Sequence, residues 1–146
     1  MKNSSKESSE KLKILVAEEN QEACSALEEL LKVLGHSVMV TQDGEDALNM
    51  FHETIPDLVF SGLTLPKLGG MELLREVKSG SGKTLFVMIC PMSDPEKIQQ
   101  ALKKGAADFL TRPIQSRELI RSLDRLVNLK KGFIVGHMDN EITPNP

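Results

Sequence analysis

Short apolar runs alternate with longer amphipathic stretches along most of the chain. The apolar runs are LKILVA, HSVMV, DLVFS, LFVMI and DFL. Between them apolar residues recur at steps of three and four positions, as in the segment 20–34, where Leu27, Leu31 and Leu34 share one face. Runs of the first kind are typical of strands, and segments of the second kind are typical of helices. The pattern therefore predicts five strands and five helices in alternation.

Residues that start and stop helices support these boundaries. Gly35 follows the first predicted helix, where a glycine is a common stop, and Gly44 opens the second. Asp94 is an expected N-cap, and Pro95 stands at the first helical position, where its missing N–H costs nothing. The predicted helices cover 20–34, 45–52, 70–79, 95–104 and 115–129.

The order of the predicted elements indicates an α/β fold. Strands that alternate with helices form parallel sheets covered on both faces. The runs LKILV, DLVF and LFVMI are apolar almost throughout, as expected for central strands that are buried on both sides. We therefore expect a doubly wound, five-stranded parallel sheet with five helices.

One ordinary domain accounts for most of the 146 residues. Residues 1–11 are rich in Ser, Lys and Glu and are expected to form a disordered N-terminal tail. Residues 12–129 carry the alternating pattern and are expected to form the domain. Periodicity is lost after Leu129, so 130–146 is expected to be a C-terminal tail or the start of a linker, although its FIV run is apolar enough to dock.

The charge balance disfavours nucleic-acid binding by this chain. Lys and Arg number 18 against 21 Asp and Glu, so there is no basic excess to hold a phosphate backbone. No apolar run approaches the roughly 20 residues that span a bilayer, and the first residues lack the apolar core of a signal peptide. We therefore expect a cytoplasmic protein that binds neither nucleic acid nor membrane.

Two local features suggest chemistry but are better explained as structure. The segment SGSGKT, residues 79–84, resembles a phosphate-binding loop, yet it follows a predicted helix and precedes a strand, the reverse of the required order. We interpret it as a flexible connection. Cys24 and Cys90 lack metal-site spacing and are too few for a disulfide framework, so we expect reduced, mostly buried thiols.

The candidate site lies at the carboxyl ends of the strands, where ligands bind in open parallel sheets. The residues there are Glu18, Glu19, Gly62, Cys90 and Arg112. With these residues and their flanks the chain resembles the receiver domains of bacterial two-component response regulators. The segments ILVAEEN, PDLVFSGLTLPKLGG, VMICPMSD and GAADFLTRPI occur in that family's order. The resemblance implies a flavodoxin-like receiver fold.

The resemblance also implies a chemistry from which this sequence departs. Family receivers carry an acidic pair, a phosphate-accepting aspartate, a Ser or Thr, and a lysine before a proline, and the carboxylates hold Mg²⁺. The corresponding residues here are the acidic pair Glu18 and Glu19, then Gly62, Cys90 and Arg112. Gly62 has no carboxylate, so it cannot accept a phosphoryl group.

Neighbouring hydroxyl groups are poor substitutes for the missing aspartate. Ser61 precedes Gly62 on a strand, so its side chain should point to the opposite face of the sheet. Thr64 lies in the following loop, and a hydroxyl needs a general base before it attacks. We therefore expect no catalytic residue and no enzymatic activity.

The polar residues that remain are expected to form an internal ion pair. With the third oxygen ligand missing, Arg112 clamped bidentately on Glu18 or Glu19 is favoured over Mg²⁺. Those two glutamates are the candidates for residual Mg²⁺ binding; we expect neither metal nor another cofactor. Cys90 is expected to fill the strand end, with redox sensing as the alternative. Phe109 matches the family aromatic that changes rotamer on activation and is expected to be locked in one rotamer.

Three functions remain open at this point. The leading hypothesis is a pseudo-receiver, a phosphorylation-independent signalling module that acts by protein–protein interaction in a two-component phosphorelay. The alternatives are a sensor of a small anion or metabolite in the vestigial acidic pocket, and a receiver phosphorylated at a shifted residue. The partners that the resemblance implies are a histidine kinase, an output domain, another regulator or a second copy of the chain.

The resemblance places partner docking on the face made by the fourth helix, the fifth strand and the fifth helix. The residues expected there include Lys103, Lys104, Asp108, Glu118 and Arg121. An ordinary solvated charged surface is the alternative interpretation of these side chains.

Overall fold

A computed structural model describes residues 11–80, 82–91 and 94–142. The tail predicted at the N-terminus lies outside this part of the chain except for its last residue, and so do the final four residues. In chain order the elements are β1 (Lys13–Ala17), α2 (Gln21–Val33), β2 (Ser37–Thr41), α3 (Gly44–Thr54), β3 (Leu58–Gly62), α4 (Gly70–Gly80), β4 (Leu85–Cys90), α5 (Pro95–Lys103), β5 (Asp108–Thr111) and α6 (Ser116–Ile142).

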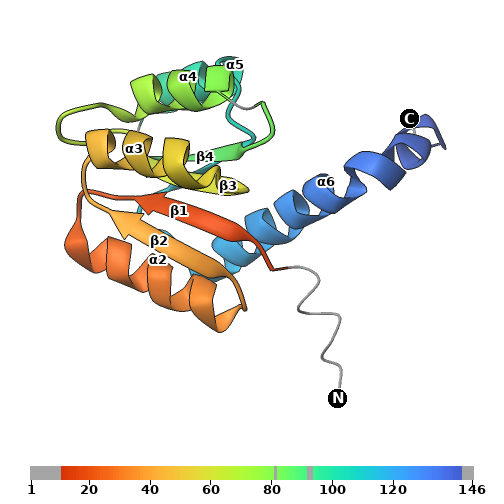
Figure 1. Cartoon of the computed structure of the whole chain (residues 1–146), viewed down its shortest axis with the longest axis horizontal. Coiled ribbons are helices and arrows are strands. Elements are labelled where there is room, and N and C mark those ends of the chain that lie inside the picture. The colour runs from red at the N-terminus through yellow and green to blue at the C-terminus, as the bar shows by residue number, and fades with distance from the viewer. Residues whose placement is uncertain (1–10, 81, 92–93, 143–146) are drawn as a thin grey trace. The chain divides into compact units, whose positions relative to one another are not determined.

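The five strands form one parallel sheet in the order β2-β1-β3-β4-β5. After β2 the chain crosses β1 to form β3 on its other side, so the direction of winding reverses beside β1. This reversal distributes the helices over both faces: Figure 1 shows α2 on one face of the sheet and α3 and α4 on the other. The predicted doubly wound α/β architecture, a flavodoxin-like fold, is confirmed.

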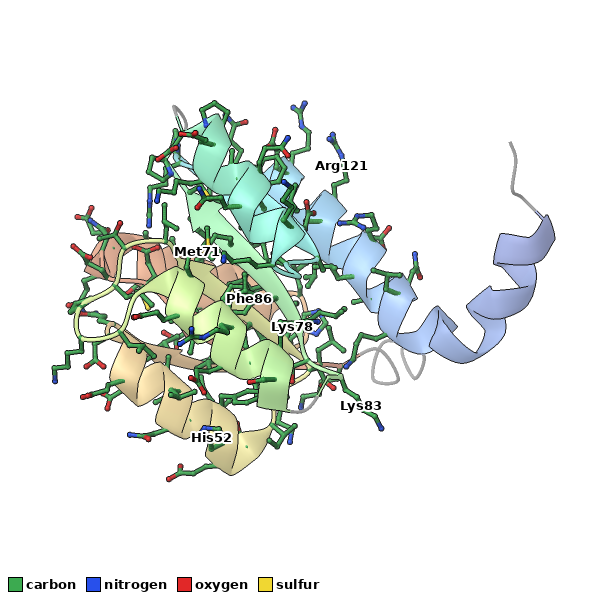
Figure 2. All side chains as sticks on the ribbon, turned by 90° about the horizontal axis from the view of Figure 1, so that it is seen from above. His52, Met71, Lys78, Lys83, Phe86 and Arg121 are labelled. Atoms are coloured by element: carbon green, nitrogen blue, oxygen red, sulfur yellow. The ribbon has the colours of Figure 1, made fainter. Side chains whose placement is uncertain are left out.

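The core explains why the central strands are apolar almost throughout. Every residue of β3 is buried, and so is every residue of β4 except the first. On one face of the sheet Leu15, Val59 and Phe86 belong to the same core cluster as Phe51 of α3 and Leu73 of α4. Figure 2 labels Phe86 among these side chains. Strands covered on both faces have no solvent side on which polar residues could alternate.

Side-chain caps fix where three of the helices begin. Asn20 caps α2 and Asp43 caps α3, each accepting a hydrogen bond of 2.8 Å from the N–H three residues further on. The Asp94 cap predicted for α5 is confirmed: its carboxylate accepts a hydrogen bond of 3.2 Å from the N–H of Lys97, the third residue of the helix. Each cap satisfies a donor that the first helical turn leaves without a backbone partner.

The last helix is longer than the sequence predicts. Periodicity suggests an end at Leu129, but α6 continues to Ile142, so that predicted boundary is wrong. The chain divides into two compact units between Ile114 and Gln115, with α6 in the second unit, and each is described by itself. The division into an N-terminal tail (1–11), a domain (12–129) and a C-terminal tail or linker (130–146) stays a prediction. No helix within the described ranges is long and apolar enough to cross a membrane.

Candidate functional site

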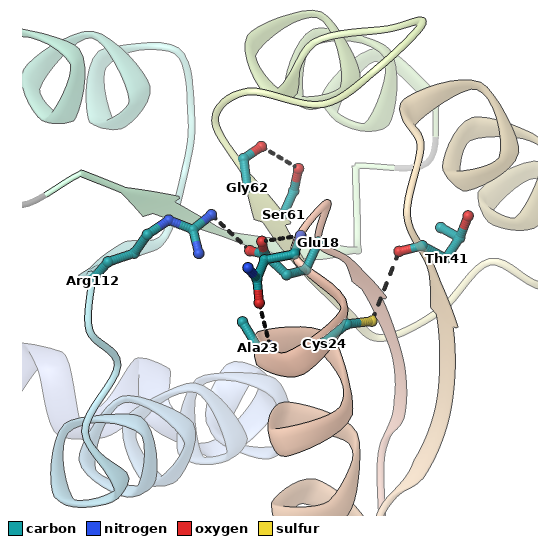
Figure 3. A network of polar contacts seen from close by, with 8 residues as sticks. Glu18, Ala23, Cys24, Thr41, Ser61, Gly62 and Arg112 are labelled. Carbon is teal, nitrogen blue, oxygen red and sulfur yellow. Dashed lines mark hydrogen bonds and ion pairs between the residues drawn. The ribbon is translucent and has the colours of Figure 1, made fainter.

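The parallel sheet brings the predicted site residues to one edge. Glu18 directly follows β1, Gly62 and Cys90 end β3 and β4, and Arg112 directly follows β5. The register aligns these ends, because Ala17 of β1 faces the penultimate residue of β3 and Cys90 pairs with the last residue of β5. Figure 3 shows the guanidinium of Arg112 meeting the carboxylate of Glu18, with Gly62 nearby.

An ion pair occupies this point. The Nη2 atom of Arg112 donates to Oε1 of Glu18 at 2.7 Å. The Glu18 side chain is 1% exposed and that of Arg112 is 36% exposed, so the carboxylate is buried beneath a guanidinium that water still reaches. The predicted internal ion pair is therefore present, and it selects Glu18 of the two glutamates.

The geometry of the pair differs from the bidentate clamp that the sequence suggests. One nitrogen of Arg112 contacts one carboxylate oxygen, while Oε2 of Glu18 accepts from the backbone N–H of Asn20 at 2.9 Å. Sequence reasoning identified Asn20 only as the start of a helix. The available signal was an acidic residue two positions before an N-cap residue, because a carboxylate oxygen readily accepts a hydrogen bond from a backbone N–H.

Gly62 faces the ion pair directly. A Cβ atom built on this glycine would lie 3.2 Å from Nη2 of Arg112 and 3.4 Å from Oε1 of Glu18. The backbone φ of Gly62 is not in the left-handed region, so close packing rather than conformational need distinguishes this glycine. The first atom of any side chain at position 62 would contact the guanidinium of Arg112. The two nearest charged groups, those of Arg112 and Glu18, are already paired with each other.

The neighbouring hydroxyls do not take over the missing position. The Ser61 hydroxyl is buried and donates to the carbonyl oxygen of Gly62 at 2.9 Å. It is therefore engaged with the main chain, as Figure 3 shows. Thr64 is exposed in the loop after β3. Neither arrangement supplies the general base that would activate a hydroxyl.

The donor set does not fit the Mg²⁺ site that the family implies. Gly62 contributes no oxygen from a side chain, both oxygens of Glu18 bind other groups, and Glu19 is exposed. Mg²⁺ requires near-octahedral oxygen ligands. Over the residues that the structure describes, no group of three or more His, Cys, Asp or Glu side chains could hold a metal ion.

Cys90 lies at the end of β4 with a fully buried side chain. Burial raises the pKa of its thiol, the carboxylate of Asp94 raises it further, and the guanidinium of Arg112 opposes the rise. Burial also raises the pKa of Cys24, whose Sγ lies 3.9 Å from the carbonyl oxygen of Thr41. A thiol that resists ionisation reacts slowly with oxidants, which disfavours redox sensing at Cys90.

Close backbone packing fixes a glycine at the end of the loop between β3 and α4. A Cβ on Gly70 would collide with the carbonyl oxygen of Gly62 and lie 2.9 Å from Cα of Leu63, so only glycine fits there. On the opposite side of the site, the Arg112–Pro113 bond is cis. The peptide bond at the position of the family's Lys-Pro step is therefore cis in this chain.

The residues of the predicted docking face fall in both units of the chain. Lys103 and Lys104 are exposed at the end of α5, and Asp108 begins β5, where it is half-buried. Glu118 and Arg121 are exposed on α6, which belongs to the other unit. Phe109 of β5 is half-buried. Docking on this face and the locked rotamer of Phe109 stay predictions.

Comparison with known sequences supports the assignment that the site suggests. The model of the response regulator receiver domain matches residues 14–124. A curated relative, "Probable transcriptional regulator ycf27" from Guillardia theta, is 31% identical over 121 residues, which make up 81% of this chain and 47% of the relative. The chain therefore spans about half the length of that relative.

Solved structures show the same fold. A response regulator receiver domain protein from Clostridium thermocellum has a TM-score of 0.78 and 27% identity, covering 84% of this chain and 98% of its own. NtrX from Brucella abortus has a TM-score of 0.78 and 28% identity, covering 82% of this chain and 28% of its own. The fold and the match of the receiver-domain model over most of the length show that this chain belongs to the receiver-domain family of two-component response regulators.

Proposed function

We propose that this receiver works without accepting a phosphoryl group, as a pseudo-receiver that signals through protein–protein interaction. The observation that carries this proposal is the ion pair between Glu18 and Arg112, which lies directly against the backbone of Gly62. A receiver needs a carboxylate at this position to form an acyl phosphate. Here a guanidinium of the protein itself takes the place of the cation, and no acceptor oxygen stands beside it.

Three further features support the same conclusion. Phosphoryl transfer needs positive charge that is free to neutralise the transferred oxygens, and Arg112 is already paired with Glu18. The Ser61 hydroxyl donates to a backbone carbonyl, which disfavours a shifted acceptor. Mg²⁺ is not needed by the module, because the remaining donors do not form a site for it. The chain therefore acts as a binding module and not as an enzyme.

The partner is a signalling protein of the two-component system: a histidine kinase, an output domain, another regulator or a second copy of this chain. The curated relative is described as a probable transcriptional regulator, so an output that controls transcription is included. A sensor of small anions is less well supported, because an anion would have to displace Glu18 from Arg112 at 2.7 Å. Cytoplasmic signalling partners imply that the module itself acts in the cytoplasm.

Amide-resolved NMR tests this proposal. The native chain is titrated with Mg²⁺ and then with beryllofluoride, which mimics a phosphorylated aspartate, beside the variant Gly62→Asp. We expect no change in the native protein. Shifts in the variant near Glu18 and Arg112 would show that the added carboxylate restores binding; a second variant, Gly62→Asp with Arg112→Lys, removes the tight contact at 3.2 Å. Beryllofluoride-dependent shifts around the site in the native chain would refute the proposal.

A further inference from the structure

A groove away from the strand-end site runs between α4 and α5. Its volume is about 520 Å³, and its surface is mainly apolar. It is lined by Met71, Glu72, Arg75, Lys78, Ser79 and Lys104. Five of these residues belong to α4, and the sixth directly follows the last residue of α5.

The α4 residues form a continuous stripe along the groove. Met71, Arg75 and Lys78 stand at positions i, i+4 and i+7 and therefore share one helical face. At 1.5 Å per residue the stripe is about 10 Å long, which matches two turns of a helix or three to four residues of an extended segment. Figure 2 shows Met71 towards one end of α4 and Lys78 towards the other.

The stem of Lys78 bridges the two helices at one end of the groove. A Cβ atom on Gly105, in the turn after α5, would lie 3.1 Å from Cε and 3.3 Å from Cγ of Lys78. Gly105 has a φ of +113°, a conformation that favours glycine. The absent side chain leaves room for the lysine stem to pack closely against the turn after α5.

The groove is positively charged on a chain that is negatively charged overall. Arg75, Lys78 and Lys104 contribute three cations against the single carboxylate of Glu72, whereas the whole chain has a net charge of −3. Among the described residues, the ion pairs join Lys32 to Glu28, Lys67 to Asp43 and Arg112 to Glu18. None of these pairs uses a cation of the groove, so all three remain available to a ligand.

We propose that this groove binds an acidic, amphipathic segment of a partner protein. An apolar side chain of the segment packs on Met71 and on the stem of Lys78, while flanking Asp or Glu residues pair with Arg75 and Lys104. This inference rests on the proposed function, because it names the class of partner that the signalling module binds. A nucleic acid fits less well, since Glu72 repels phosphates and the apolar floor has no counterpart in a phosphate backbone.

The test is an NMR titration of the full chain with a synthetic acidic peptide. The probe is an acetylated peptide of about seven residues, rich in Glu and with two leucines one helical turn apart; as a helix it is about 10 Å long, which matches the groove. A control peptide carries Gln in place of Glu. We expect amide shifts that cluster at Met71, Arg75, Lys78 and Lys104, and an affinity that falls as salt is added.

Charge reversal identifies which residues bind the peptide. Arg75→Glu combined with Lys104→Glu is expected to weaken binding about tenfold or more, since two attractive contacts become repulsive. The control is Lys97→Glu, which reverses one charge, where the double variant reverses two, on an exposed residue of α5 outside the groove; it is expected to change affinity less than about twofold. Thermal unfolding of each variant verifies that it is folded.

Several outcomes would overturn the inference. These are the absence of shifts in the groove, equal binding of the Gln peptide, an equal effect of Lys97→Glu, and tighter binding of a single-stranded oligonucleotide at the same residues. Failure here is distinguishable from failure of the proposed function, which is tested by beryllofluoride at the strand ends. If the native chain binds neither beryllofluoride nor the peptide, the phosphorylation-independent module remains supported and the proposed peptide site in the groove is refuted.

Discussion

Replacing Arg112 by alanine should destabilise the protein much more than the loss of an ordinary surface ion pair. The substitution leaves the Glu18 carboxylate, 1% exposed, without its cation. Breaking a buried pair from one side typically costs about 3 to 5 kcal/mol. The Arg112 side chain is 36% exposed, so water can partly replace it, and Glu18 keeps its bond to Asn20. We therefore expect a loss of about 2 to 3 kcal/mol.

The assay is unfolding by heat and by urea at neutral pH, followed by circular dichroism. For a chain of this size the expected loss lowers the Tm by about 6 to 9 °C, at about 3 °C per kcal/mol. The matched control is Lys32→Ala, which removes an exposed pair with Glu28 at 2.9 Å and should cost about 0.3 to 0.5 kcal/mol.

A double variant separates the lost charge pair from lost packing. Adding Glu18→Gln to Arg112→Ala removes the unpaired charge, so the double variant should be about 1 kcal/mol more stable than Arg112→Ala alone. Two results would refute the reasoning. One is a loss in Arg112→Ala no larger than in the Lys32→Ala control, and the other is a double variant that is less stable than Arg112→Ala alone.

Three more predictions follow from contacts elsewhere in the fold. Gly70→Ala should lower the free energy of unfolding in urea by about 1 to 3 kcal/mol, because the new Cβ meets backbone atoms. Gly69→Ala, whose Cβ would have its nearest neighbour 4.0 Å away, should lower it by less than about 0.5 kcal/mol, and equal losses would contradict the reasoning. Cys24 and Cys90 have raised pKa values in the folded state, so the free energy of unfolding should be highest below pH 9.0 and fall above it as the thiols of the unfolded chain ionise. A free energy of unfolding that is constant between about pH 8 and 10 in the native chain, or an equal slope after Cys90→Ala, would count against this. Thr84→Val should cost about 1 to 3 kcal/mol, measured by urea unfolding, because it removes the 2.6 Å hydrogen bond from a buried hydroxyl to a backbone carbonyl; a loss below about 0.3 kcal/mol would show that this bond adds little.

The fold was predictable because each local signal agrees with the global arrangement. Apolar strands, the Asp94 cap and the glycine that ends the first helix all point to the same alternation of elements, and the sheet satisfies each of them. The end of the last helix was not predictable in this way. Gly132 and Gly136 each disfavour a helix by about 1 kcal/mol, so the segment after Leu129 resembles an end although α6 continues through it.

The candidate site was predictable only as a set of positions. The spacing of the strands indicates that Glu18, Gly62 and Arg112 meet, because parallel strands end at the same edge. Which glutamate pairs with Arg112, and through how many atoms, depends on the turn after β1, where Asn20 takes one carboxylate oxygen. The groove beside α4 depends on a similar detail, the approach of Lys78 to Gly105, which no sequence period encodes.

The separation of the two charged partners has a consequence for synthesis of the protein. Glu18 and Arg112 are 94 residues apart, so a chain growing on the ribosome contains the carboxylate long before the guanidinium. Until β5 has emerged, β4 also lacks its outer neighbour and presents an unpaired, apolar edge. Emergence of β5 and of the residue that follows it therefore supplies both missing partners, and a nascent chain that stops before Asp108 has neither the neighbour of β4 nor the cation of Glu18.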